Sequence, residues 1–140
     1  AAIPLLVSFI PMLMDTGGNC GSQSSTLIIR GIALGEIQFS DLFRVMFKEF
    51  RVSLIVGVAL ALANGIRILI MYKNAGLALV IGLSLVATIV ISKLIGCVLP
   101  LIAKKLHMDP AIMASPLITT LVDTCSILIY FNIATQVFQL

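Results

Sequence analysis

Charged residues are scarce in this chain: they make up 11% of its 140 residues, whereas hydrophobic residues make up 60%. A soluble domain carries about 25% charged residues. A domain this short also leaves roughly 30% of its unfolded-chain surface in contact with water, so the apolar excess cannot all be buried. The composition therefore excludes an ordinary soluble domain, and it also excludes a disordered tail, which needs few apolar residues.

Tryptophan is absent, and histidine and cysteine are rare. Cys20, Cys97 and Cys125 are scattered through apolar runs, which indicates buried free thiols and not a disulfide framework. His107 has no Cys/His companions for a zinc site. The sequence has no phosphate-binding glycine loop and no nucleophile with a histidine partner, so we expect no enzyme. The net charge of +3 does not indicate nucleic acid, because the basic residues lie between apolar segments.

Four long apolar segments dominate the chain, at about residues 1–29, 52–71, 75–103 and 110–140. Each reaches the roughly 20 residues needed to cross a hydrocarbon core about 30 Å thick, where helices satisfy the backbone polar groups. We therefore predict an all-α membrane protein with four transmembrane helices in a single domain, residues 1–140. Because Ala1 opens directly into an apolar stretch without a leader, we expect a fragment that begins inside or just before a membrane helix.

The connections between these segments predict the orientation. Residues 30–51 form a long polar and amphipathic link, 64–74 a short turn and 104–109 a tight connection. The first and third connections share one face, which carries six basic residues: Arg30, Arg44, Lys48, Arg51, Lys104 and Lys105. The opposite turn carries two, Arg67 and Lys73. The positive-inside rule therefore puts residues 30–51 and 104–109 in the cytoplasm.

Asp123 is the most informative polar residue inside an apolar segment. The pair Asp109-Pro110 predicts a helix start, and Asp123 follows Asp109 by 14 residues (123 − 109), roughly 21 Å along a helix and near the membrane midplane. The same helical face carries four hydroxyl side chains: Ser115, Thr119, Ser126 and Tyr130. Intramembrane carboxylates are costly, so we favour an ion or proton site. The alternative is a buried carboxylate that these hydroxyls satisfy.

The first segment repeats this pattern. One of its helical faces carries Asp15, Asn19, Ser22, Thr26 and Arg30, with Gln23 at the edge. Glycines 17, 18 and 21 allow close helix packing, or a loosened helix whose carbonyls face a polar cavity. Two polar helix faces favour a shared aqueous path, and a small-residue packing face is the alternative. Lys93 is explained by snorkelling, or else by an intramembrane Asp partner or a structural tether.

The predicted site contains only oxygen ligands, which hard cations prefer. Mg²⁺ keeps several of its waters, so a site with few carboxylates can hold it through the water shell. One chain offers only Asp123 and Asp15 near the midplane, and a two-fold dimer would double them and place the pathway near the symmetry axis. Inward movement of a divalent cation gains about 4.6 kcal/mol per 100 mV, so ATP is not required.

Two separated motifs carry a family resemblance. Residues 11–30, PMLMDTGGNCGSQSSTLIIR, resemble the signature of the MgtE family of magnesium channels. Residues 109–123, DPAIMASPLITTLVD, followed by LIYF at 128–131, are similar to the last membrane helix of that family. The pieces KLIG at 93–96 and LP at 99–100 also match.

The resemblance implies a homodimeric Mg²⁺ channel in the plasma membrane, the inner membrane of a prokaryote, with five membrane helices per subunit. The first of these helices and the cytoplasmic regulatory domains would lie outside this chain. The pore would lie between subunits, lined by segments 1–29 and 110–140, with Asp123 contacting the hydrated ion. The implied pore-lining residues are Asn19, Gly17, Gly18, Thr119 and Ser115, to which the polar face of the first segment adds Asp15 and Thr26.

Other functions are compatible with the same residues. An ion-coupled secondary carrier for divalent cations would use the same carboxylates. An intramembrane aspartyl protease would need Asp15 and Asp123 within hydrogen-bonding distance, and the sequence lacks a Gly-x-Gly-Asp run. A non-conducting assembly subunit is the remaining alternative. The sequence does not rank Mg²⁺ against Mn²⁺, Co²⁺ and Ni²⁺.

Overall fold

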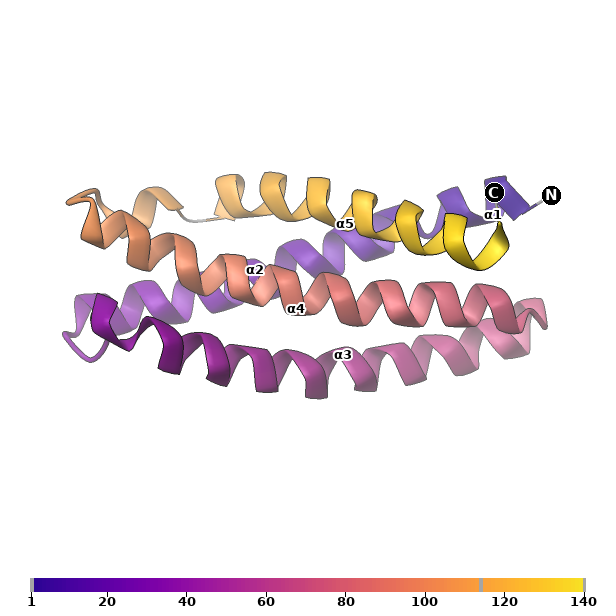
Figure 1. The fold of residues 1–140 in the computed structure, drawn as a ribbon, viewed down its shortest axis with the longest axis horizontal. Helices are drawn as coiled ribbons and strands as arrows, with labels where there is room; N and C mark the ends of the chain where they lie inside the picture. The colour runs from indigo at the N-terminus through magenta and orange to yellow at the C-terminus, as the bar shows by residue number, and fades with distance from the viewer. Residues whose placement is uncertain (1, 114, 140) are drawn as a thin grey trace.

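The computed structural model describes residues 2–113 and 115–139, and their long helices run side by side along one axis (Figure 1). The elements in chain order are α1 (Ala2–Ser8), α2 (Ile10–Ala33), the 3-10 helix η1 (Phe39–Asp41), α3 (Leu42–Tyr72), α4 (Ala75–Lys105), the 3-10 helix η2 (Pro110–Met113) and α5 (Ser115–Phe138). The described residues contain no strand. The all-α prediction is confirmed for them.

Three stretches of the described chain are long and apolar enough to cross a membrane: Phe39–Tyr72, Ala75–Lys105 and Pro110–Phe138. They correspond to the last three predicted spans. α2 has 24 residues, or about 36 Å of helix, but the polar residues on its outer face lower its hydropathy. A membrane-crossing role for α2 therefore stays a prediction.

The N-terminal half departs from the predicted boundaries. The segment expected as one helix over residues 1–29 is divided at Phe9, because Pro11 cannot donate a backbone hydrogen bond and stands in the first turn of α2. The long link expected over residues 30–51 is short, since α2 continues to Ala33 and α3 begins at Leu42.

The two later connections also differ. The turn expected from Asn64 to Asn74 is confined to Lys73 and Asn74, because the apolar residues before them continue α3 to Tyr72. Lys73 ends α3 with a left-handed φ of 50°, and the Asn74 side chain caps α4 by accepting a 3.0 Å hydrogen bond from the Leu77 N–H. Asp109-Pro110 begins η2 and not a continuous helix, and α5 starts only at Ser115.

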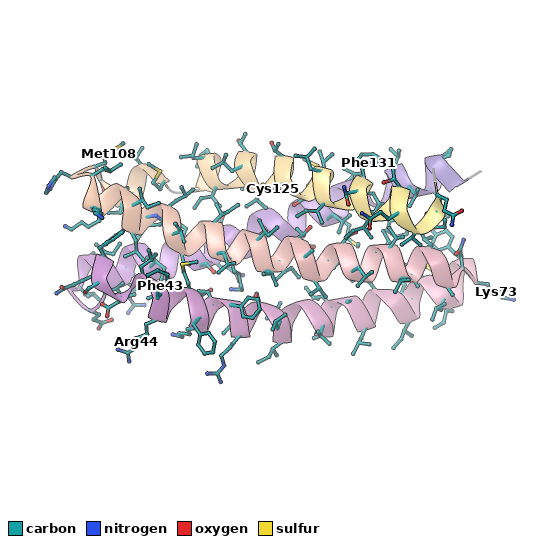
Figure 2. All side chains as sticks on the ribbon, in the orientation of Figure 1. Phe43, Arg44, Lys73, Met108, Cys125 and Phe131 are labelled. Atoms are coloured by element: carbon teal, nitrogen blue, oxygen red, sulfur yellow. The ribbon has the colours of Figure 1, made fainter. Side chains whose placement is uncertain are left out.

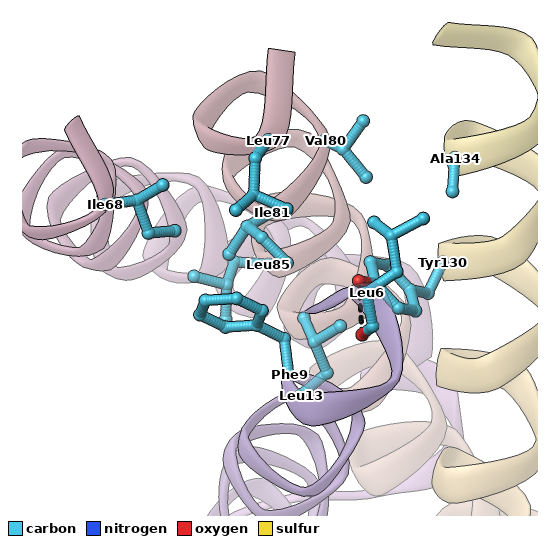
Figure 3. Packing of buried hydrophobic residues seen from close by; sticks show 10 residues of the cluster. All are labelled: Leu6, Phe9, Leu13, Ile68, Leu77, Val80, Ile81, Leu85, Tyr130 and Ala134. Atoms are coloured by element: carbon cyan, nitrogen blue, oxygen red, sulfur yellow. Dashed lines mark hydrogen bonds between the residues drawn. The ribbon is translucent and has the colours of Figure 1, made fainter. Parts of the chain in front are cut away.

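α4 is the central helix, packed against α3, α2 and α5. The larger buried cluster lies at the end of the bundle that holds both chain termini, and Figure 3 shows its side chains: Leu6, Phe9, Leu13, Ile68, Leu77, Val80, Ile81, Leu85, Tyr130 and Ala134. The Tyr130 hydroxyl donates a 2.7 Å hydrogen bond to the Leu6 carbonyl inside this cluster. A smaller cluster contains Ile28, Val45, Cys97 and Leu101.

Glycines allow α2 to approach both of its neighbours closely. A Cβ atom at Gly96 of α4 would collide with the carbonyl oxygen of Gly21. A Cβ at Gly21 would lie 2.9 Å from Ile118 Cγ2, and one at Gly17 would lie 2.8 Å from Val122 Cγ1, both on α5. Part of the glycine-rich run therefore forms a packing face, as in membrane helix pairs that use small residues.

We predict that Gly96→Ala lowers the stability of the full-length protein by about 1–3 kcal/mol, because the new methyl group has no space beside the α2 backbone. Gly65→Ala is the matched control, since a Cβ there meets no atom within 4 Å and Ala favours helix over Gly. Thermal unfolding in detergent should show a lower melting temperature for Gly96→Ala only. Equal melting temperatures for the two variants would contradict the described contact.

Candidate ion pathway

α2 and α5 together form a hollow of about 190 Å³ around the carboxylate that the sequence singled out. Its lining residues are Met14, Asp15, Gly18, Asn19, Thr119 and Asp123. We call this space the Asp123 hollow. Asp15 and Asn19 are exposed and Asp123 is partly buried. The hollow therefore brings together four polar side chains from two helices, among them both predicted intramembrane aspartates.

Gly18 sets how closely the two helices approach in this hollow. A Cβ at Gly18 would lie 3.2 Å from Thr119 Cγ2 and 4.0 Å from Asp123 Oδ1. The absence of a side chain leaves the carboxylate beside the α2 backbone. The Thr119 hydroxyl donates a 3.0 Å hydrogen bond to the Pro116 carbonyl, one turn earlier on α5, which holds this side chain in one orientation at the edge of the hollow.

A second polar hollow continues along α2 from Asn19, which lines both. It has a volume of about 560 Å³ and is lined by Asn19, Ser22, Gln23, Thr26 and Leu27. We call it the α2 groove. The Thr26 hydroxyl donates a 2.9 Å hydrogen bond to the Ser22 carbonyl. The polar face predicted for the first segment thus extends for several turns on the outer side of α2.

Some predicted residues lie elsewhere. Gly17 is buried on the opposite side of α2, against Thr88 and Val122, and does not line either hollow. Ser126 and Tyr130 do not line the Asp123 hollow, because both are buried in the helix contacts, where they donate hydrogen bonds to the carbonyls of Val122 and Leu6.

The Ser115 side chain lies outside the described residues. Among the hydrogen bonds and ion pairs of residues 2–113 and 115–139, none engages the Asp123 carboxylate or joins it to Asp15.

The donor set resembles that of a hydrated ion site. In the described part of the chain, no group of three or more His, Cys, Asp or Glu side chains could hold a metal directly. The Asp123 hollow offers two carboxylates, an amide and a hydroxyl. Such a set of oxygen ligands can bind Mg²⁺ through its retained waters and does not favour a thiophilic metal.

The comparison with known families decides the affiliation. The model of the MgtE family, described as a divalent cation transporter, matches residues 10–133. The chain belongs to the MgtE family. The matched range includes the whole of α2 and also Asp123 on α5, so both helices that line the Asp123 hollow contribute to the match.

Curated MgtE relatives support the same affiliation. The proteins named "Magnesium transporter MgtE" from Bacillus subtilis and Thermus thermophilus are 42% identical over 130 residues and 37% identical over 134 residues. The protein of that name from Enterococcus faecalis is 35% identical over 132 residues. The alignments cover 93%, 95% and 94% of this chain, but the chain spans only 29% of the length of each relative.

This MgtE chain also contains a buried ion pair that sequence reasoning missed. Lys93 Nζ of α4 lies 3.4 Å from Glu49 Oε2 of α3, and each residue is only 6% exposed. Ser24 of α2 donates a 2.6 Å hydrogen bond to the same carboxylate oxygen and accepts one of 3.2 Å from Lys93. The prediction that the Lys93 side chain snorkels to the membrane surface is therefore wrong. The contacts support the alternative that Lys93 is a structural tether, here between α4 and the helices α2 and α3.

The sequence prediction assigns residues 30–51 to a connecting link. Glu49 falls inside this link, so the prediction does not place it in the bundle interior beside Lys93. A signal is nevertheless present in the sequence. Val45, Glu49, Ser53 and Gly57 recur every four residues, and all four are buried on α3. This spacing marks one helix face. Continuing the helical pattern back into the link would place Glu49 in the bundle interior.

We predict that Glu49→Ala destabilises the full-length MgtE protein by about 3–5 kcal/mol, because it leaves the Lys93 ammonium buried without its partner. The double variant Glu49→Ala/Lys93→Met removes both charges and should recover most of that loss. Chemical or thermal unfolding of the wild type, the single variants and the double variant measures the coupling. A double variant whose loss equals the sum of the losses of its single variants would show that the two charges do not interact.

Proposed function

We propose that this chain forms part of the pore of a channel that conducts Mg²⁺ across the plasma membrane down its electrochemical gradient. The observation that carries the proposal is the Asp123 hollow, where helices distant in sequence place carboxylate, amide and hydroxyl groups around one space. Asp123 recognises the hydrated ion, and Asp15, Asn19, Thr119 and the Gly18 backbone line its path. Family membership and the names of the relatives support Mg²⁺ as the conducted ion.

The α2 groove extends this path. Its residues Asn19, Gln23 and Thr26 continue from the hollow toward the end of α2 that carries Arg30. The combined space is large enough for many waters, because a single water needs only about 10–15 Å³ in such a measure. An ion moving along it keeps a water shell, and a wet passage lowers the cost of a carboxylate at membrane depth. α2 is then the fourth membrane-crossing helix.

A second copy of the chain would complete the passage. Both hollows lie on exposed polar surface of α2, and lipid would be a poor neighbour for that surface. A two-fold arrangement that apposes α2 and α5 of two subunits would cover it and double the carboxylates around one axis. The proposed assembly is a homodimer in which the remaining part of each longer protein supplies the first membrane helix and the cytoplasmic regulatory domains.

We predict that Asp123→Asn lowers Mg²⁺ flux about 10- to 100-fold, because a charge-assisted contact with the ion's waters contributes about 1.5–3 kcal/mol. Flux is measured with the full-length protein in liposomes that contain a Mg²⁺ indicator. Glu36→Gln, which neutralises an exposed acid outside both α2 and α5, is the control and should conduct normally. Unchanged flux in a folded Asp123→Asn protein would remove Asp123 from the pathway. Repeating the assay with Mn²⁺, Co²⁺ and Ni²⁺ measures selectivity.

A channel also differs from an ion-coupled carrier in its energetics. We expect Mg²⁺ flux to follow membrane voltage and the Mg²⁺ gradient, and to be unaffected when an imposed proton or sodium gradient is collapsed at constant voltage. Single-channel currents from the full-length protein in planar bilayers would agree with this expectation. Uphill Mg²⁺ uptake driven by a proton or sodium gradient would establish the carrier instead.

A further inference from the structure

The first turns of α3 present an unusual combination of exposed side chains. Three phenylalanines are exposed to different extents: Phe43 by 81%, Phe47 by 62% and Phe50 by 39%. Arg44, Lys48 and Arg51 follow each of them by one residue and are exposed as well. We call these six residues the basic-aromatic face. Figure 2 shows Phe43 and Arg44 at one end of the bundle and Lys73 at the other.

The length of α3 places this face beside lipid headgroups. α3 has 31 residues, or about 46 Å of helix, which exceeds a hydrocarbon core of about 30 Å by roughly ten residues. The residues from 52 to 72 contain a single charge, Arg67, so the first ten residues of α3 are the part that extends beyond the core. Positive charges gather at this end of the bundle, as expected on a cytoplasmic surface.

The face suits neither water nor hydrocarbon alone. Exposed phenyl rings favour an apolar environment, whereas guanidinium and ammonium groups require polar partners. The Arg51 guanidinium lies 5.8 Å from the centre of the Phe47 ring, so the positive charge and the aromatic ring are direct neighbours on this face. A membrane interface provides acyl chains and phosphodiesters at adjacent depths.

The charge of the face indicates the type of lipid. Glu49 is the single acid in the first ten residues of α3, and it is buried against Lys93 and not exposed among the three cations. The nearest preceding acid, Asp41, accepts a 2.9 Å hydrogen bond from the Gln38 N–H. Glu36 is exposed and lines one hollow with Lys48, so one acid lies beside the three cations and the outward surface keeps a positive excess, which complements an anionic headgroup.

We propose that the basic-aromatic face binds anionic phospholipids of the cytoplasmic leaflet. The lipid phosphodiesters contact Arg44, Lys48 and Arg51, and the upper acyl chains pack against the three phenylalanines. This site is separate from the ion pathway, because α3 packs on α4 and the proposed path lies between α2 and α5.

The test uses full-length protein in mixed phosphatidylcholine and phosphatidylglycerol bilayers. Spin-labelled lipid of either headgroup reports, by electron paramagnetic resonance, the fraction immobilised on the protein. Wild type should prefer phosphatidylglycerol several-fold. Arg44→Gln/Lys48→Gln/Arg51→Gln should lose about fivefold or more of this preference, given the usual attraction of each basic residue to an anionic surface. Arg67→Gln/Lys73→Gln, which changes basic residues at the other end of α3, should retain it.

Two further measurements keep the test decisive if the triple variant folds poorly. Arg44→Lys/Arg51→Lys keeps the charge and should keep the preference. For wild type, the preference should fall as ionic strength rises from about 0.01 M to 1 M, where the screening length shrinks from about 30 Å to 3 Å. An unchanged preference in the triple variant, or no preference in wild type because a protein segment covers the face, would overturn the proposal. So would displacement of the lipid by inorganic phosphate but not by chloride of equal ionic strength, which would indicate a site for a free anion.

Discussion

The backbone contact between Gly21 of α2 and Gly96 of α4 is the constraint on which the bundle depends. A Cβ on Gly96 would occupy the space of the Gly21 carbonyl oxygen, so any larger residue forces the helices apart. With α2 held against α4, Gly17 and Gly21 also meet side chains of α5. α5 then stands close enough for Asp123 and α2 to line the same hollow. Small residues, which contribute little hydrophobic area, thus determine where the carboxylate lies.

The charged residues in the interior of the bundle are paired, whereas those that line the Asp123 hollow are not paired with one another. Lys93 and Glu49 neutralise one another in the interior, and Ser24 binds both, so α2, α3 and α4 meet at one polar cluster. Asp15 and Asp123 instead line a hollow at the surface of the chain. Paired charges contribute little net field at a distance, whereas carboxylates without a neighbouring cation in the described chain attract cations. In the proposed channel, a cation on the path therefore encounters negative charge and little of the field of Lys93.

The outer surfaces of α2 and α3 differ in polarity. α2 exposes amides and hydroxyls along its groove, whereas α3 exposes mostly large apolar side chains, with cations near its ends. A membrane offers lipid to one kind of surface and water to the other. The division supports an assembly in which α3 faces lipid and α2 faces another subunit. Both proposed sites, for hydrated ion and for lipid, follow from this segregation.

The amino-acid pattern was sufficient to predict an all-α chain, its last three candidate spans, the polar face of α2 and Asp123 as the candidate carboxylate, but not the bounds of the helices. Hydropathy and helical periodicity are local properties, so residues such as Asn19 and Thr26 could be assigned to one face without a structure. Only the folded chain shows which glycines pack against neighbouring helices and which line a hollow. The same is true of the hydrogen bond from Tyr130 to the Leu6 carbonyl and of the acid that neutralises Lys93. These outcomes depend on helix rotation and on neighbours 44 to 124 residues apart, which local pattern does not encode.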